Sequence, residues 1–288
     1  MLADVHSLTT VHDGADLARN KKAVLLDYFS LIDEKLLESP SFFIFEQSKV
    51  KRLMDIFWVL SSVTPYSLIL RSHAFKDAQV KNAQINMAVF NYSILMTADI
   101  ITYDVDFVPV GKDQQQHIEF ARDIAEFFNN TYKTQIFKLP SWSIAEDVGL
   151  IPGLDGRKMS KSYDNYIGVF EDEKILKKKI MAIPTDATPL EAPKNPDSDN
   201  VFNLIRFFAT KERTDDIRAK YLKWGYGYGH AKLELLEIIL DYTKPFREKR
   251  KHLEQDFGYI EKILTQGNRR ANDLADTKYE AILKIIGL

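Results

Sequence analysis

DFVPVGKDQQQHIEFARDIAEFF, residues 106 to 128, is the stretch that decides the fold. It begins with a short apolar run that suits a β-strand and passes through a turn at Gly111 into a segment of helical length. Apolar side chains recur there at a helical period, and they form one face made of Ile118, Ala121, Ile124, Ala125 and Phe128. A strand followed directly by an amphipathic helix is typical of an α/β protein with a parallel sheet.

The rest of the first 165 residues alternates in the same way. Apolar periodicity predicts strands in residues 2–10 and 41–48, and helices in residues 21–37, 50–63 and 92–103. Strands separated by helices of this length favour a Rossmann-like parallel sheet with helices on both of its faces.

Beyond residue 171 the strand patterns stop. The remaining apolar periods are helical, in residues 171–181, 201–209, 214–222, 230–257 and 269–286. A Pro-rich segment, residues 184–200, connects the first two of these helices. We therefore expect a Rossmann-like domain in residues 1–166 and an all-α helical domain in residues 167–288.

The composition excludes several classes of protein. Of the 288 residues 45% are hydrophobic and 28% are charged, which predicts a globular fold with a core. There is no cysteine, so disulfides and thiolate metal sites are excluded, and the six histidines have no zinc-like spacing. We expect no metal bound by protein ligands. No apolar run approaches the roughly 20 residues that cross a bilayer, and the first ten residues do not resemble a signal peptide, so a cytoplasmic location is expected.

The net charge of −2 argues against broad electrostatic binding of nucleic acid. The charge is uneven, however, because residues 201–288 contain 17 Lys and Arg against 13 Asp and Glu. This basic excess in the last third of the chain allows a contact with RNA there without requiring one.

The turn at Gly111, Lys112 and Asp113 lies where a strand ends and a helix begins. In open parallel sheets ligands bind at the carboxyl ends of the strands, and a helix amino terminus favours phosphate. The alternative is an ordinary turn in which Asp113 caps the helix.

Asp99 is the exceptional residue of the predicted helix 92–103, because that helix is otherwise apolar. Helical spacing places it on one face with Tyr92 and Met96. Burial of an aspartate is costly unless a hydrogen-bond donor reaches it. Either Asp99 points to solvent or a donor from a ligand binds it.

GLDGRKMSKSYDN, residues 153 to 165, combines two lysines with two hydroxyls behind a glycine-rich bend. Lys158 and Lys161 on such a loop are suited to an anionic group whose charge grows during a reaction. Ser160 and Ser162 add donors for phosphate oxygens. The alternative is a solvated basic loop.

KMSKS is the second signature of class I aminoacyl-tRNA synthetases, and nearly the whole chain resembles the bacterial tryptophanyl-tRNA synthetases. The resemblance rests on GLDGRKMSKSYDN together with ADVHSLTT, LRSHAFKDAQ, MTADIITYD, FVPVGKDQQQHIEFARDIAE, PKNPDSDNVFNLIRFFA and GYGYGHAKLELLE. Tyrosyl enzymes of this fold have Gln at the position of Met96 and GSDQ at the position of GKDQ, so tryptophan is favoured over tyrosine.

The resemblance implies a tryptophan–tRNA ligase that uses ATP and Mg²⁺, charges tRNA(Trp) and forms a homodimer. Asp99 would bind the indole nitrogen, in a pocket lined by Tyr92, Met96, Val108, Val110 and Gln114. Lys158 and Lys161 would be catalytic, stabilising the departing pyrophosphate. ATP would contact Gly111, Lys112, Asp113, Leu150, Ile151, Lys158, Met159, Ser160, Lys161 and Ser162. The helical domain would bind the anticodon.

One family feature is absent from the 288 residues. Class I enzymes have a first signature, HIGH or a similar tetrapeptide, and no match to it occurs after the first strand. Met1 aligns within the family's second strand, so we expect the strand, turn and helix that bear HIGH to be missing. ATP binding would then be impaired, and a non-catalytic protein that binds tryptophan or tRNA is the alternative.

Overall fold

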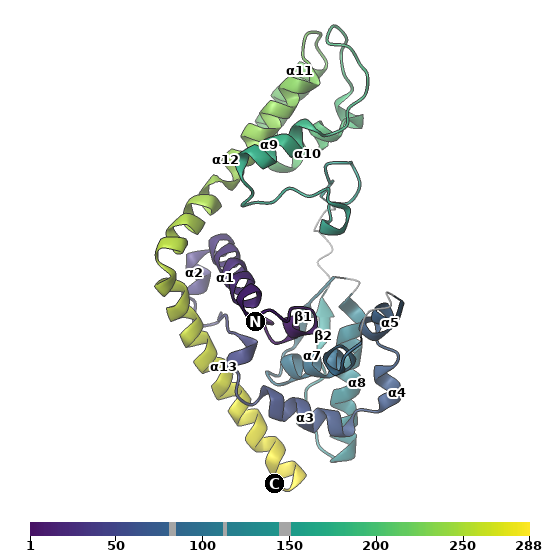
Figure 1. The fold of residues 1–288 in the computed structure, drawn as a ribbon, viewed down its shortest axis with the longest axis vertical. Helices are drawn as coiled ribbons and strands as arrows, with labels where there is room; N and C mark the ends of the chain where they lie inside the picture. Colours follow the sequence, from purple (N-terminus) through teal and green to yellow (C-terminus); the bar gives the residue numbers. More distant parts are fainter. Residues whose placement is uncertain (81–84, 112–113, 144–150) are drawn as a thin grey trace. The chain divides into compact units, whose positions relative to one another are not determined.

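The computed structural model describes residues 1–80, 85–111, 114–143 and 151–288. By its internal contacts the chain forms two compact units. Unit 1 comprises Met1–Leu25, Ile32–Asp147 and Phe257–Leu288, and unit 2 comprises Leu26–Leu31 and Val148–Asp256. Figure 1 shows the elements of both units along the chain.

The sheet of unit 1 is small and parallel. β1 (Phe107–Pro109) pairs with β2 (Ser141–Ser143), with Val108 opposite Trp142. This confirms the strand expected before the Gly111 turn. β2 was not predicted, because three residues after a proline are too short to show a period of two.

The two strands expected in residues 2–10 and 41–48 are reduced to a single parallel bridge between Leu2 and Glu46. Leu2 donates its N–H to the carbonyl of Phe45, and Gln47 donates to the carbonyl of Leu2, as in a parallel ladder. The chain then turns into the 3₁₀-helices η1 (His6–Thr9) and η2 (Gln47–Lys49). The strand prediction was wrong for most of both segments, because their polar residues turn inward to bond one another instead of extending the ladder.

The core of unit 1 lies between three helices, α3 (Leu53–Val63), α7 (Tyr92–Ile101) and α8 (Gln115–Thr131), as expected from the sequence. The predicted inner face of α8 is confirmed, because all five of its residues are fully buried. Figure 1 shows β1 and β2 beside α7 and α8. The other helices of this part of the chain are α1 (Gly14–Leu31), α2 (Glu34–Leu37), α4 (Tyr66–Ile69), α5 (His73–Val80) and α6 (Met87–Phe90).

The last helix, α13 (Phe257–Ile286), belongs to unit 1. Its buried residues Ala271, Ala275 and Ile282 join the core that α3, α7 and α8 form. The sequence predicts one all-α domain in residues 167–288. The boundaries of the compact units differ from this predicted domain boundary, because Phe257–Leu288 lies in unit 1. An amphipathic period shows that a helix has a buried face, but it does not show which core that face meets.

Unit 2 is helical outside the lysine loop, as predicted. It contains α9 (Glu173–Met181), α10 (Asn200–Phe208), α11 (Lys211–Tyr221), α12 (Tyr228–Gln255) and the 3₁₀-helices η4 (Lys161–Tyr163) and η5 (Pro196–Ser198). Their core includes Leu176, Phe202, Tyr221 and Leu235, all fully buried. Among the described helices of the chain, none has the length and apolarity to cross a membrane.

Candidate functional site

Asp99 is buried within unit 1, with only 5% of its side chain exposed. It lies near the end of α7, whose apolar residues Ile94, Ala98 and Ile101 anchor the helix in the core. Of the two alternatives, a solvent-facing Asp99 is therefore excluded. The donor that reaches it in the structure is the side-chain amide of Gln47, 3.0 and 2.8 Å from the two carboxylate oxygens.

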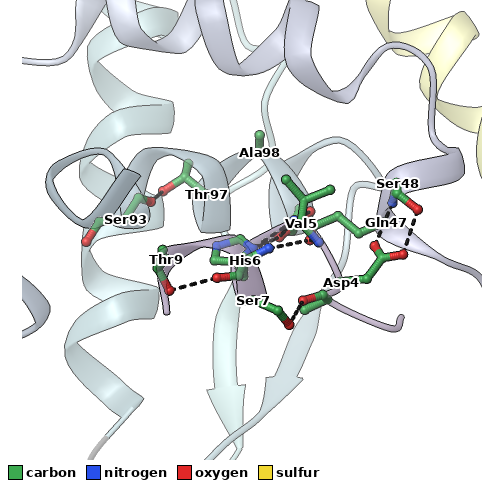
Figure 2. Close-up of polar contacts among 12 residues, drawn as sticks. Asp4, Val5, His6, Ser7, Thr9, Gln47, Ser48, Ser93, Thr97 and Ala98 are labelled. Carbon is green, nitrogen blue, oxygen red and sulfur yellow. Dashed lines mark hydrogen bonds and ion pairs between the residues drawn. The ribbon is translucent and has the colours of Figure 1, made fainter. Parts of the chain in front are cut away.

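Gln47 is itself 1% exposed, and all of its polar atoms are used. Its Oε1 accepts the backbone N–H groups of Val5 and His6, at 3.0 and 3.2 Å. Its Nε2 lies 2.8 Å from His6 Nδ1 as well as against Asp99. Figure 2 shows this amide joining η2 to the first residues of the chain. An amide whose bonds are all satisfied has one orientation, so Asp99 is held in one orientation too.

The charge state of this cluster is set by burial. Burial raises the pKa of Asp99 to about 7, despite the hydrogen bond from Gln47, which lowers it. Burial likewise lowers the pKa of His6 and so favours the neutral imidazole. The Nδ1 of His6 lies 2.8 Å from the Gln47 amide nitrogen and 3.5 Å from Asp99 Oδ2, so the tautomer of the imidazole sets which of the two it bonds. The site is thus a buried carboxyl that titrates near neutral pH, beside an uncharged histidine.

The residues predicted to line the pocket are largely apolar. Met96, Val108 and Val110 are half-buried and pack against the core of unit 1. The ring of Tyr92 meets His6 edge to face, with centroids 4.5 Å apart, and the Asp99 charge helps burial to raise the pKa of Tyr92. Gln114 is exposed at the amino terminus of α8, where its backbone N–H donates to the carbonyl of Gly111.

His6 and Gln47 are the functional candidates that sequence reasoning missed. They lie in residues 2–10 and 41–48, which the sequence predicts as strands. Gln47 is 41 residues from His6 and 52 residues from Asp99 along the chain. The available signal was a polar side chain inside an apolar run, because such a residue is buried only when it has a partner.

The predicted contacts to ATP at the turn are only partly described. Gly111 is exposed at the carboxyl side of β1. Lys112, Asp113 and Leu150 lie outside the described residues. Ile151 is 38% exposed and accepts the backbone N–H of Met159 at the base of the lysine loop.

The lysine loop of unit 2 is closed by one buried side chain, Asn165, which is 4% exposed. Its Oδ1 accepts the N–H of Ser160 at 2.7 Å, and its Nδ2 donates to the carbonyl of Lys158 at 3.0 Å. The chain leaves no room for a side chain at Gly153, because an added Cβ would lie 2.2 Å from the Asn165 amide. The loop therefore has a defined path, although its surface is polar.

Along this path the side chains divide into two sets. Met159 is half-buried and packs against the core of unit 2. Lys158, Lys161 and Ser162 are exposed, and neither lysine ammonium group forms an ion pair with another described residue. Ser160 caps η4, accepting the N–H of Ser162 at 3.2 Å. Two exposed cations on a fixed backbone, without an ion-pair partner in the described part of the chain, are suited to binding polyanions.

In the part of the chain that the structure describes, no three acidic or histidine side chains come together as a metal site.

Comparison with known proteins gives a consistent result. Residues 1–242 match the family described as tRNA synthetases class I (W and Y). The chain is 42% identical to the tryptophan–tRNA ligase of Fusobacterium nucleatum over 287 residues, which cover all of this chain and 87% of that protein. It is 40% identical to the tryptophan–tRNA ligase of Campylobacter jejuni, covering 88% of it.

Solved structures agree. The crystal structure of the Campylobacter jejuni tryptophanyl-tRNA synthetase complexed with ADP and tryptophan superposes with a TM-score of 0.93 at 39% identity, over 99% of this chain and 88% of that one. The Mycoplasma pneumoniae tryptophanyl-tRNA synthetase, at 22% identity and a TM-score of 0.74, shares the fold.

Proposed function

This chain belongs to the class I tryptophanyl-tRNA synthetase family, and from that premise we propose how its residues divide the work of a tryptophan–tRNA ligase. The reaction has two steps. The carboxylate of tryptophan attacks the α-phosphorus of ATP, giving tryptophanyl-adenylate and pyrophosphate, and the tryptophanyl group then passes to the 3′ end of tRNA(Trp). The tyrosine-specific alternative finds no support among the relatives compared.

The observation that carries the proposal is the buried Asp99 carboxyl. Indole has a single N–H, and a carboxylate with spare lone pairs accepts it while Gln47 occupies other lone pairs. Met96, Val108 and Val110 offer apolar and polarisable surface to the indole ring, and Tyr92 and Gln114 complete the proposed pocket. An amino acid without a matching N–H would leave Asp99 without this donor and would bind less tightly.

Lys158 and Lys161 are proposed as the catalytic groups of the first step. Negative charge builds on the pyrophosphate as it leaves, so cations aimed at it act mainly in the transition state. Ser160, Ser162 and the backbone around Met159 would donate to phosphate oxygens. Gly111, Lys112 and Asp113 would contact the ATP ribose, and Leu150 or Ile151 the adenine.

Mg²⁺ is proposed to arrive bound to the ATP phosphates, because this ion commonly binds through substrate phosphates and keeps several waters. The lysine loop fits that arrangement, because its cations and hydroxyls can bind the same phosphates that carry the ion. When bound, Mg²⁺ would neutralise part of the charge on the phosphates.

The partners proposed beyond the small substrates are tRNA(Trp) and a second copy of the chain, in the cytoplasm where tRNA is charged. We propose residues 167–288 as the region that includes the anticodon contact and residues 1–166 as catalytic. An apolar surface on unit 1 supports the homodimer. Leu8, Met54 and Met87 are 48%, 43% and 68% exposed around a cavity of about 270 Å³.

Tryptophan-dependent exchange of pyrophosphate into ATP tests the proposal. The 288-residue chain is assayed with tryptophan, with tyrosine and with neither, alongside calorimetric titration with each amino acid. Binding of tryptophan is expected, and a tryptophan–tRNA ligase gives exchange that requires tryptophan. Exchange with tyrosine instead would overturn the proposal, and tight tryptophan binding without exchange would favour the non-catalytic tryptophan-binding alternative.

A further inference from the structure

The carboxyl-terminal helix α13 approaches the strand-like segment before Gln47 unusually closely. Gly267 is buried in the middle of this helix. A Cβ added there would lie 1.8 Å from the carbonyl oxygen of Ile44 and 2.7 Å from its carbonyl carbon. Glycine in a helix interior is destabilising relative to alanine. Here the close contact with the Ile44 backbone requires it, because no side chain fits. The helix and residue 44 are thus fixed against each other.

The next residue of α13, Asn268, fixes the next part of that segment. Its Oδ1 accepts the backbone N–H of Glu46 at 2.8 Å, and its Nδ2 donates to the Glu46 carboxylate, also at 2.8 Å. The other oxygen of this carboxylate pairs with Lys21, 2.6 Å away. Lys21 also pairs with Asp4, which accepts the N–H of Ser48. Backbone and side chain of Glu46 are therefore both held, in an environment where Glu46 is 9% exposed.

Gln47 follows Glu46 directly in the chain, and its amide is the donor that orients Asp99. Few contacts connect α13 to the Asp99 carboxylate. Asn268 fixes the position of residue 46, which is bonded covalently to residue 47. The Gln47 side-chain amide then donates to Asp99. Each contact lies within unit 1. A hydrogen bond loses strength when a donor is displaced or misaligned, so freedom at residue 46 weakens the alignment at Asp99.

We propose that Asn268 is a positioning residue for tryptophan recognition, acting through Glu46 and Gln47 on Asp99. The inference rests on the proposed function, in which Asp99 accepts the indole N–H. Through this role α13 would contribute to amino-acid selectivity, although the sequence analysis assigns this helix to the predicted tRNA-binding domain.

Asn272 provides a matched control. It lies one turn further along α13, is half-buried like Asn268, and also bridges to the segment after Gln47. Its Nδ2 donates to the carbonyl of Lys49 at 2.8 Å, and its Oδ1 accepts the N–H of Lys51 at 3.0 Å. Both asparagines thus make two hydrogen bonds to the segment around Gln47, and Asn272 Nδ2 also donates to the Asn268 carbonyl at 2.7 Å. Of the two, only Asn268 holds the residue adjacent to Gln47.

The test compares Asn268→Ala with Asn272→Ala in the full 288-residue chain. Calorimetry measures Kd for tryptophan and for 3-benzothienyl-alanine, in which sulfur replaces the ring N–H. For Asn268→Ala we expect Kd for tryptophan to rise about tenfold, a loss of about 1.4 kcal/mol. Kd for the analogue should change less than twofold, so the preference for tryptophan shrinks. Asn272→Ala should leave both constants within twofold of the wild type.

A conservative pair separates positioning from folding. The double variant Asn268→Asp with Glu46→Gln exchanges donor and acceptor between the two side chains while the backbone N–H of residue 46 keeps an acceptor. It should restore the tryptophan preference to within threefold of the wild type. Unchanged preference in Asn268→Ala, an equal loss in Asn272→Ala, or no recovery in the double variant would overturn the inference. A wild-type chain that does not bind tryptophan would instead contradict the proposed function.

Discussion

The Asp99 cluster and the lysine loop each depend on a single buried amide, but only the amide of Gln47 contacts the side chains proposed to function. The Nε2 of Gln47 faces the functional side chains Asp99 and His6, while its Oε1 accepts the backbone N–H groups of Val5 and His6. Asn165 bonds the loop backbone: it accepts the N–H of Ser160 and donates to the carbonyl of Lys158. Its amide also donates to the Asp155 carboxylate. One site holds its carboxylate in a single orientation. The other fixes the backbone, while its lysines have no ion-pair partner among the described residues.

This difference matches the work proposed for each region. Recognition of a single N–H needs an acceptor that is already oriented and desolvated, because orienting it during binding would cost affinity. Stabilisation of a leaving pyrophosphate needs cations that are not already neutralised by neighbouring carboxylates. Substitutions in one region should therefore change binding and leave the chemical step alone, and substitutions in the other should do the reverse.

The largest expected effect is on the loop. Lys161→Ala should slow pyrophosphate exchange by about 10²- to 10³-fold, because a charge-stabilising donor is lost only in the transition state. Kd for tryptophan should not change. Lys177→Ala, an exposed lysine on α9, serves as the control and should keep wild-type exchange. A parallel loss of tryptophan binding in Lys161→Ala would mean that the loop is structural and the comparison fails.

The next effect is on the buried acceptor. Asp99→Ala removes the acceptor of a charge-assisted hydrogen bond and leaves the Gln47 amide without its partner, at a cost of about 2–3 kcal/mol in tryptophan affinity. This corresponds to a Kd raised by about 30- to 150-fold. Titration with tryptophan, tyrosine and phenylalanine measures it. If the variant still discriminates among the three as the wild type does, Asp99 does not select the indole.

Removal of the loop amide sharpens the comparison. Asn165→Ala leaves the Ser160 N–H and the Lys158 carbonyl without their partner, which should lower the free energy of unfolding by about 1–3 kcal/mol. Exchange should fall by about tenfold at an unchanged Kd for tryptophan, because the lysines lose their fixed backbone. Thermal melting and exchange kinetics report the two effects. Wild-type exchange in a destabilised variant would show that the loop path does not matter for catalysis.

The smallest effect is a dependence on pH. The pKa of Asp99 is raised to about 7, so the protonated carboxyl becomes the main form as pH falls below this value. Tryptophan affinity should fall by up to about tenfold per pH unit there, and Asp99→Asn should abolish the dependence. Among the neighbours, burial lowers the pKa of His6 and raises those of Tyr92 and Tyr103. An equal slope in Asp99→Asn would assign the titration to another group.

The raised pKa of Asp99 also makes the stability of the fold depend on pH, in the opposite direction to tryptophan affinity. A carboxyl whose pKa is higher in the folded chain than its ordinary 3.8 favours folding in its protonated form. Its contribution to stability is therefore present at low pH and is lost as pH rises from about 4 to about 7. Chemical denaturation of wild type and Asp99→Asn across this range measures the difference.

Local sequence patterns predicted several features of the fold and one residue of the candidate site. The inner face of α8 follows from apolar residues at a helical period, and a lone aspartate in an apolar helix marked Asp99. The arrangement that orients Asp99 was not predictable, because Gln47 is 52 residues away and only the folded backbone brings the two together. The place of α13 was hidden for a similar reason, since Gly267 gives no sign of its partner Ile44 until the contact is seen.

Calorimetric titration of the wild-type chain with tryptophan and with 3-benzothienyl-alanine tests the central claim most directly. The two ligands have nearly the same shape and differ in the ring N–H that Asp99 is proposed to accept. The account predicts that tryptophan binds at least tenfold more tightly, a difference of at least about 1.4 kcal/mol. Equal affinity for the two would contradict it, because the buried carboxylate would then take no part in recognition.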